Sequence, residues 1–301
     1  DRMNLEAVDF IDRNSEKPFF LYLSHFAPHT ILNGRPDLVE KYRQKHAPGP
    51  SERDTCYLCQ DAGFEGDPMN HWAMDHNPHL AAMIETIDDG VGMIVEKLKA
   101  HDLLENTVII FTSDNGGEHN VTSNAPLRGA KSQLYEGGIR EPMIASWLGT
   151  LPQNTTCDEV VNILDFYPTI LDLVQIEPDK NQLLDGVSFA TVLRNPTTKL
   201  DRDTNYWHYP LEKKHFLEGR SAGAIRKGDW KLIEFFDTGE LELYNLKDDI
   251  GESQNLAESQ PERAASLLAM LREWRRSNNI TIPENCKDYD PTVRDHTWQG
   301  E

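Results

Sequence analysis

The sequence has no apolar stretch as long as a membrane span, and it has fewer basic than acidic residues. Its 30 Lys and Arg stand against 50 Asp and Glu, which gives a formal net charge of −20 at pH 7. A field of that sign repels nucleic acid and anionic membranes, so we expect no nucleic-acid partner. Because no apolar run is long enough, we also expect no membrane span in this segment. A small anionic group can still be bound by a few cations placed locally.

Cysteine is also scarce, with four in the chain, two of which form a CxxC motif at Cys56 and Cys59. The histidines that follow, His71, His76 and His79, are not spaced as in a zinc finger, and no second CxxC occurs. The sequence therefore favours a disulfide or free thiols over zinc at this motif.

The chain begins at Asp1 rather than Met, directly before the helix-like stretch Leu5–Arg13. We interpret this start as truncated, so the sequence is uninformative about a signal peptide. N-x-S/T sequons occur at Asn120, Asn154 and Asn279. Such triplets arise often by chance, so they add little support for a secretory route.

Short apolar runs alternate with a helical pattern in the first part of the chain. Buried strands are predicted at Pro18–Leu23 and Val108–Phe111, and Met143–Trp147 is a candidate for a third strand. Apolar residues at spacings of three and four predict a helix over Leu80–His101, and Val160–Val174 predicts another. This alternation is typical of an α/β fold with a mixed or parallel sheet flanked by helices. Residues 33–77, rich in Pro, Gly and charge, predict a long surface excursion.

The pattern changes after Asp185-Gly186. The short runs Ile225–Lys227, Lys231–Phe236 and Leu241–Leu246, joined by Gly-Asp and Thr-Gly turns, predict a small antiparallel sheet. Pro261–Asn278 predicts an amphipathic helix. We therefore expect a larger α/β domain over 1–180 and a smaller antiparallel-sheet plus helix subdomain over 181–301.

Polar side chains follow two of the predicted strands. Ligands bind beyond the carboxyl ends of such strands, so His29 and Asp114 are expected to converge on one cleft. Asp114 and Asn115 offer a carboxylate and an amide oxygen, the ligands of hard cations, and two glycines follow. Taken alone, this DNGG stretch is more often a tight turn than a metal site.

Lys131 and His29 are candidates for charge stabilisation and proton transfer. A lysine near a divalent cation can neutralise an oxyanion in a transition state, and a histidine can protonate a leaving oxygen. Considered singly, Lys131 reads as a surface cation and His29 as a loop histidine packed by Phe26 and Pro28.

Three motifs follow one another in the chain: SDNGG (113–117), LRGAK (127–131) and YEGGIREP (135–142). Their combination favours functional roles for these residues over the structural ones. In this order and spacing they resemble the signature of the sulfatase family of the alkaline phosphatase superfamily. Further similar segments lie at 18–29, 76–92, 165–169, 184–188, 225–232 and 242–256.

The resemblance implies an alkaline-phosphatase-like fold and a role for each matching residue. It implies that Asp114 and Asn115 are two ligands of one Ca²⁺ ion, and that Lys131 binds the sulfate oxygens as a catalytic residue. His29, which aligns better than His25, would protonate the leaving alkoxide. The segment Tyr206–Pro210 (YWHYP) looks like one found in polysaccharide sulfatases, so His208 is a candidate at the substrate mouth; an aromatic-rich structural loop is the alternative.

The family's nucleophile is not among these 301 residues. None of the four cysteines precedes x-Pro/Ala-x-Arg, the context in which the first residue becomes formylglycine, and the paired aspartates that complete the calcium site are absent too. A missing N-terminal segment explains these absences together. We therefore expect the chain alone to be inactive and the complete protein to be a sulfuric ester hydrolase of the arylsulfatase type.

The resemblance leaves the substrate and two other functions open. The YWHYP segment favours a sulfated glycan over a small aryl sulfate. A phosphoester or phosphonate hydrolase of the same superfamily and a non-catalytic, sulfatase-like binding protein are the alternatives. The family and the sequons favour a secreted, lysosomal or periplasmic location.

Overall fold

The computed structural model describes residues 2–45, 77–119, 121–212, 214–215 and 217–283. Cys56, Cys59, His71, His76, Asn120 and Cys286 lie outside these ranges. Cys157 is an exposed free thiol. The chain divides into two compact units. The first unit comprises residues 1–111, 120–123 and 144–155, and the second comprises 112–119, 124–143 and 156–301.

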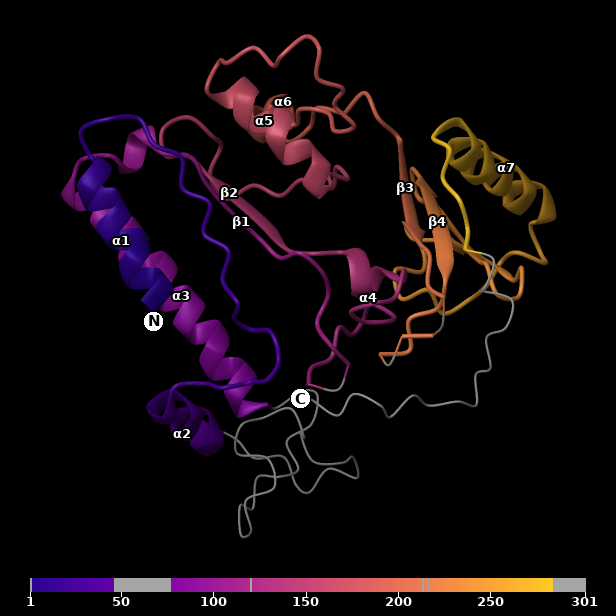
Figure 1. The fold of residues 1–301 in the computed structure, drawn as a ribbon, viewed down its shortest axis with the longest axis horizontal. Helices are drawn as coiled ribbons and strands as arrows, with labels where there is room; N and C mark the ends of the chain where they lie inside the picture. Colours follow the sequence, from indigo (N-terminus) through magenta and orange to yellow (C-terminus); the bar gives the residue numbers. More distant parts are fainter. Residues whose placement is uncertain (1, 46–76, 120, 213, 216, 284–301) are drawn as a thin grey trace. The chain divides into compact units, whose positions relative to one another are not determined.

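Helices dominate the first unit (Figure 1). Its helices are α1 (Arg2–Asn14), α2 (Pro36–Lys45), α3 (Pro78–Ala100) and a 3-10 turn at Leu104–Asn106. The strands β1 (Ile109–Thr112) and β2 (Met143–Ser146) pair in a two-stranded sheet whose ends reach into the second unit. The stretch predicted as the helix Leu80–His101 is confirmed in α3, and the predicted strands Val108–Phe111 and Met143–Trp147 occur as β1 and β2. The burial predicted for Val108–Phe111 is wrong, because no residue of β1 is buried and Phe111 is 40% exposed.

Helix α3 begins where its local sequence directs it to begin. Asn77 Oδ1 accepts hydrogen bonds from the backbone N–H groups of His79 (3.0 Å) and Leu80 (3.1 Å), and Pro78 occupies the first helical position. On the helix surface, Gly90 faces the buried Asn4 of α1, whose side-chain carbon lies 2.3 Å from where a Cβ on Gly90 would stand. Close packing of α1 on α3 therefore requires a glycine here.

The predicted strand over Pro18–Leu23 is wrong for this structure. Residues 18–26 form neither helix nor strand, and Phe20 and Tyr22 are 68% and 78% exposed. An apolar run becomes a strand only when another strand completes its backbone hydrogen bonds, and no strand of the described residues pairs with this run. Helix α2 also lies in the stretch predicted as an irregular excursion.

A four-stranded sheet with one covering helix forms the main part of the second unit (Figure 1). Its strands are β3 (Thr204–Tyr209), β4 (Ala222–Lys227), β5 (Trp230–Phe235) and β6 (Leu241–Asn245), all antiparallel in sequential order. The unit also contains α4 (Glu136–Ile139), a 3-10 turn at Ile163–Asp165, α5 (Phe166–Leu173), α6 (Ala190–Arg194) and α7 (Pro261–Ser277). The predicted antiparallel sheet and C-terminal helix are confirmed, whereas the predicted helix over Val160–Val174 begins only at Phe166.

The two faces of this sheet bury different partners. On one face, Ile225, Leu232 and Leu243 pack against Leu267 and Leu271 of α7. On the other face, the buried side chains Ala224, Ile233, Phe235 and Tyr244 pack against Leu134 and Tyr135, which come just after Lys131. The segment that follows Lys131 therefore lies on the face of the sheet opposite α7.

Candidate active site

Backbone hydrogen bonds join the three sequence motifs into one structure within the second unit. Lys131 N donates to Gly117 O at 3.1 Å, and Gly116 N donates to Gly138 O at 3.1 Å. Gly137 N donates to Arg128 O at 2.7 Å. Residues 113–117, 127–131 and 135–142, which are separate in sequence, are thereby held together.

The glycines allow this close approach of backbone to backbone. A Cβ on Gly116 would lie 1.8 Å from Gly137 O, a distance no real side chain tolerates. A Cβ on Gly137 would lie 2.4 Å from Gly129 O. The paired glycines in two motifs are thus required by contact between the motifs.

Asn124 is a site residue that sequence reasoning missed. Its Oδ1 accepts from Gly117 N at 3.1 Å, and its Nδ2 donates to Gly117 O at 2.9 Å and to Gly129 O at 3.2 Å. One amide side chain therefore fastens the DNGG turn to the loop before Lys131. Its position between two recognisable motifs was the only sequence signal that pointed to it.

The side-chain oxygens of Asp114 and Asn115 fit part of a hard-cation site. Asp114 is exposed, and its Oδ1 accepts from Asn115 N at 3.0 Å. Asn115 Nδ2 donates to Gly116 O at 3.0 Å, which leaves Oδ1 as the ligand end of that amide. Calcium takes six to eight oxygen ligands, and the described residues contain no group of three His, Cys, Asp or Glu side chains arranged for a metal.

Glu141 adds an acidic oxygen beside this pair. Its Oε1 is buried and makes no hydrogen bond in the described structure. Burial, with the negative charge of Asp114, raises the pKa of Glu141 to about 7, against a lowering hydrogen bond with Ser113. A nearby cation would stabilise this buried, unpaired oxygen and the carboxylate of Asp114 beside it.

An ion network buried in the second unit anchors α4, which follows Lys131 in the chain. Lys231 Nζ lies 2.9 Å from Glu136 Oε1 and 2.8 Å from Glu252 Oε1, and all three side chains are at most 2% exposed. Glu252 Oε2 also accepts from Glu136 N at 2.6 Å. The YEGGIREP motif is thus tied to strand β5 by charged groups that sequence reasoning did not single out.

Two histidines in the first unit have different surroundings. The Asn4 side chain donates through Nδ2 to Thr86 O (2.9 Å), so its Oδ1 accepts from His25 Nε2 at 2.8 Å. His25 is therefore engaged in packing α1 with α3. His29 is exposed, and its Nδ1 donates to Thr30 O at 2.7 Å.

His208 lies on the α7 face of the sheet, opposite the face that carries Leu134 and Tyr135. It is on strand β3, whereas an aromatic-rich structural loop was the alternative for this segment. Its ring is 5.3 Å from that of Phe236, and its Nε2 donates to Thr281 O at 3.2 Å. The structure therefore brings Asp114, Asn115 and Lys131 together but not His208, and the role predicted for His208 stays a prediction.

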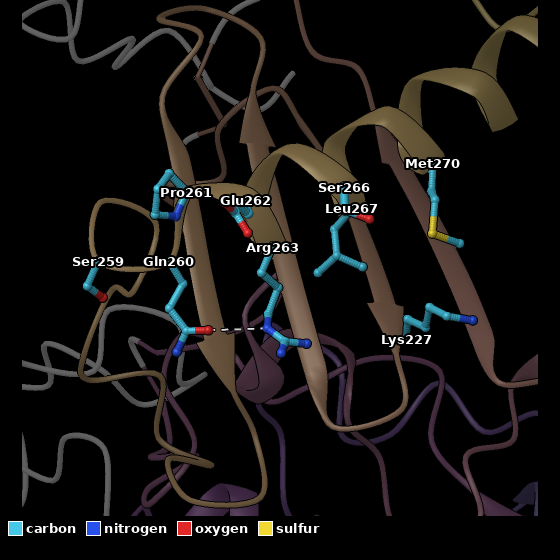
Figure 2. Close-up of a pocket in the computed structure, with 9 residues that line it drawn as sticks. All are labelled: Lys227, Ser259, Gln260, Pro261, Glu262, Arg263, Ser266, Leu267 and Met270. Carbon is cyan, nitrogen blue, oxygen red and sulfur yellow. Dashed lines mark hydrogen bonds between the residues drawn. The ribbon is translucent and has the colours of Figure 1, made fainter.

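A surface hollow of about 630 Å³ lies along the N-terminal end of α7. Figure 2 shows Arg263 and Gln260 there, joined by a hydrogen bond of 3.2 Å between Arg263 Nε and Gln260 Oε1. Arg263 also stacks over Trp230 at 4.1 Å. This hollow lies on the α7 side of the sheet, so it is separate from the Lys131 segment.

Comparison with known proteins settles the family. The family model described as Sulfatase matches residues 1–176, more than half of the chain. This chain belongs to the sulfatase family. The model described as N-sulphoglucosamine sulphohydrolase, C-terminal, matches residues 130–277.

Individual sulfatases resemble nearly the whole chain. A sulfatase of Formosa agariphila is 32% identical over 312 residues, covering 95% of this chain and 52% of that protein. The N-acetylgalactosamine-6-sulfatase of Canis lupus familiaris is 32% identical over 260 residues, covering 84% and 41%. The crystal structure of Ps i-CgsB in complex with k-i-k-neocarrahexaose matches with a TM-score of 0.73 and 28% identity, covering 93% of this chain and 55% of that one.

These likenesses confirm the predicted α/β sulfatase fold. The chain spans about half the length of the curated relatives it matches. In the described residues no helix is long and apolar enough to cross a membrane. The predicted domain boundary at 180/181 and the individual site residues stay predictions.

Proposed function

We propose that the complete protein hydrolyses sulfate esters of a sulfated sugar. The observation that carries this proposal is the joining of three sulfatase motifs around Gly117, with Lys131 N on Gly117 O and the Asp114–Asn115 pair two residues before it. The sulfated-sugar class is supported by the name of the canine relative and by the oligosaccharide bound in the Ps i-CgsB structure.

Lys131 and His29 each have one proposed role in the reaction. Lys131 binds the sulfate oxygens and offsets their growing charge, because its ammonium group is placed by a segment fixed at both Gly117 and Leu134. His29 gives a proton from Nε2 to the leaving oxygen while its Nδ1–H stays on Thr30 O.

Two groups beyond these 301 residues complete the proposal. Asp114 and Asn115 would hold a calcium ion through one carboxylate and one amide oxygen, and that ion would add positive charge at the sulfuryl oxygens. A formylglycine side chain, in a segment of the complete protein outside residues 1–301, would supply the nucleophile, so the chain alone would be inactive. We also propose a secreted, lysosomal or periplasmic location, in line with the sequons at Asn154 and Asn279.

The test measures sulfate release by the full-length protein from N-acetylgalactosamine 6-sulfate and from k-i-k-neocarrahexaose, with the corresponding phosphate monoester beside the first. We expect Lys131→Ala to lower kcat/KM by about 10²–10³-fold, the size of the loss when one transition-state donor is removed. Lys131→Arg should retain part of the activity because it keeps the charge.

Exposed Glu218, in the same unit, supplies the matched control, and Glu218→Gln should be as active as the wild type. Faster release of phosphate than of sulfate would replace this proposal with the phosphoester hydrolase. Binding of the sulfated sugars without release of either product would favour a non-catalytic sulfatase-like protein.

A further inference from the structure

The DNGG turn and the end of the YEGGIREP motif run side by side in opposite directions within the second unit. Thr112 Oγ1 donates to Pro142 O at 3.0 Å, and Gly116 N donates to Gly138 O at 3.1 Å. Between these two bonds the residue numbers rise along one segment and fall along the other. Glu141, next to Pro142, therefore lies against the stretch that contains the two proposed calcium ligands.

The carboxylate of Glu141 has fewer hydrogen-bond donors than its burial requires. Its Oε1 is buried and makes no hydrogen bond with the described residues. The Ser113 hydroxyl contacts the carboxylate, but the same hydroxyl donates to Asn115 O at 3.2 Å. A hydroxyl has one proton and cannot donate fully to both acceptors. Glu141 is therefore left with an unsatisfied acceptor beside the DNGG turn.

The charge of Glu141 destabilises the protein when no cation is present. A buried carboxylate oxygen without a donor costs free energy, and the negative charge of Asp114 adds repulsion. Arg140, the cation beside Glu141 in the chain, pairs with Glu136 instead, with Nη1 3.4 Å from Oε2. A neutral side chain would therefore suit the fold better at this position, whereas a bound cation would offset the cost of the charge.

We propose that Glu141 belongs to the calcium site and that its carboxylate strengthens the binding of the ion that Asp114 and Asn115 hold. This inference rests on the proposed function and adds a third group to the two ligands named there. Calcium binds carboxylate oxygens, and the number of charged groups helps to set its affinity. A cation at this place accounts for a buried, unpaired oxygen that the fold alone does not need.

Calorimetric titration of CaCl₂ into the full-length protein, freed of metal with a chelator, measures the role of the charge. Glu141→Gln keeps the length and shape of the side chain and should raise the Kd for calcium about 10–100-fold, the usual effect of losing a group that supports a metal site. Glu141→Asp keeps the charge and should recover part of the loss. Glu262→Gln removes the same charge from an exposed position on α7 and should match the wild type.

Melting temperatures with and without calcium separate binding of the cation from support of the fold. The metal-free Glu141→Gln variant should melt at the wild-type temperature or above it, because it buries no unpaired charge. Added calcium should raise its melting temperature less than that of the wild type, since the stabilisation by a ligand depends on the ratio of its concentration to Kd. An unchanged Kd in Glu141→Gln, or a lower melting temperature of its metal-free form, overturns the inference.

Calcium binding decides the inference separately from hydrolysis. If the wild type binds calcium but releases no sulfate, the proposed function fails, and a weaker affinity in Glu141→Gln still supports the inference. If the wild type releases sulfate and Glu141→Gln binds calcium as tightly as the wild type, only the inference fails. A wild type that binds no calcium overturns the inference together with the calcium site.

Discussion

Replacing Lys231 by Met tests whether the buried ion network holds the site segments together. The Lys231 side chain is 0% exposed and lies within 2.9 Å of both Glu136 and Glu252. After its removal Glu136 keeps Arg140 at 3.4 Å and Arg226 at 3.6 Å. The Glu252 carboxylate keeps the hydrogen bond from the Glu136 backbone N–H and a longer-range attraction to Arg226. A charge buried without its ionic partner costs about 3–5 kcal/mol, so we expect the free energy of unfolding to fall by that amount.

The dependence on pH gives the same prediction a second measurement. In the wild type, the effect of burial exceeds that of the positive charge of Lys231, so the pKa of Glu252 is raised. Loss of the Lys231 ammonium group should raise that pKa further. A carboxyl group whose folded pKa lies above its unfolded value destabilises the fold increasingly as pH rises through the folded pKa. The loss in Lys231→Met should therefore be larger at pH 8 than at pH 5.

Urea unfolding followed by tryptophan fluorescence measures both effects. The double variant Lys231→Met with Glu252→Gln removes the uncompensated charge and should be more stable than Lys231→Met alone. Lys199→Met is the control. It breaks the ion pair between Lys199, whose side chain is 81% exposed, and Glu159, and it should leave the unfolding midpoint unchanged. A loss below about 1 kcal/mol in Lys231→Met, or no recovery in the double variant, would refute the reasoning.

Two further changes test other parts of the fold. Burial lowers the pKa of His208, and the hydrogen bond to Thr281 O opposes this shift. Protonation of His208 therefore favours the unfolded state. The free energy of unfolding is highest above the unfolded pKa near 6.5 and falls as pH falls through the folded pKa. Denaturation between pH 7.5 and 5 should therefore show a flatter stability profile for His208→Gln, and an unchanged slope contradicts this. Gly116→Ala would drive a Cβ to 1.8 Å from Gly137 O and should lower the melting temperature, whereas Gly92→Ala, with open space on helix α3, should raise stability by about 0.5–1 kcal/mol. Equal effects of the two alanines would argue against tight contact between the motifs.

The correct predictions of the fold came from local patterns. Helix α3 carries its own start signals in Asn77 and Pro78. The hairpins of the small sheet carry theirs in Gly228 (φ +57°) and Gly239 (φ +73°), where glycine readily adopts the left-handed backbone. Such signals act over a few residues, so they can be recognised without knowing which distant segment packs against the helix or hairpin.

The wrong predictions needed a partner that lies elsewhere in the chain. Pro18–Leu23 has a strand-like composition, but its strand state depends on a neighbour that completes its hydrogen bonds. Strand β3 was missed because aromatic residues occupy successive positions and hide the alternation between faces. Its pairing with β4, such as Tyr206 opposite Ile225, reveals that Trp207 and His208 face opposite sides.

For the candidate site, the sequence determined the residue types and their order: the three motifs, Asp114, Asn115 and Lys131 could all be named in advance through the family resemblance. Only the tertiary structure decided that Lys231 neutralises Glu136, 95 positions earlier, and that Glu252 receives the Glu136 N–H from 116 positions away. Pairs so distant meet only when strands are registered and packed, because no local pattern in the chain encodes which buried charges will share one interior.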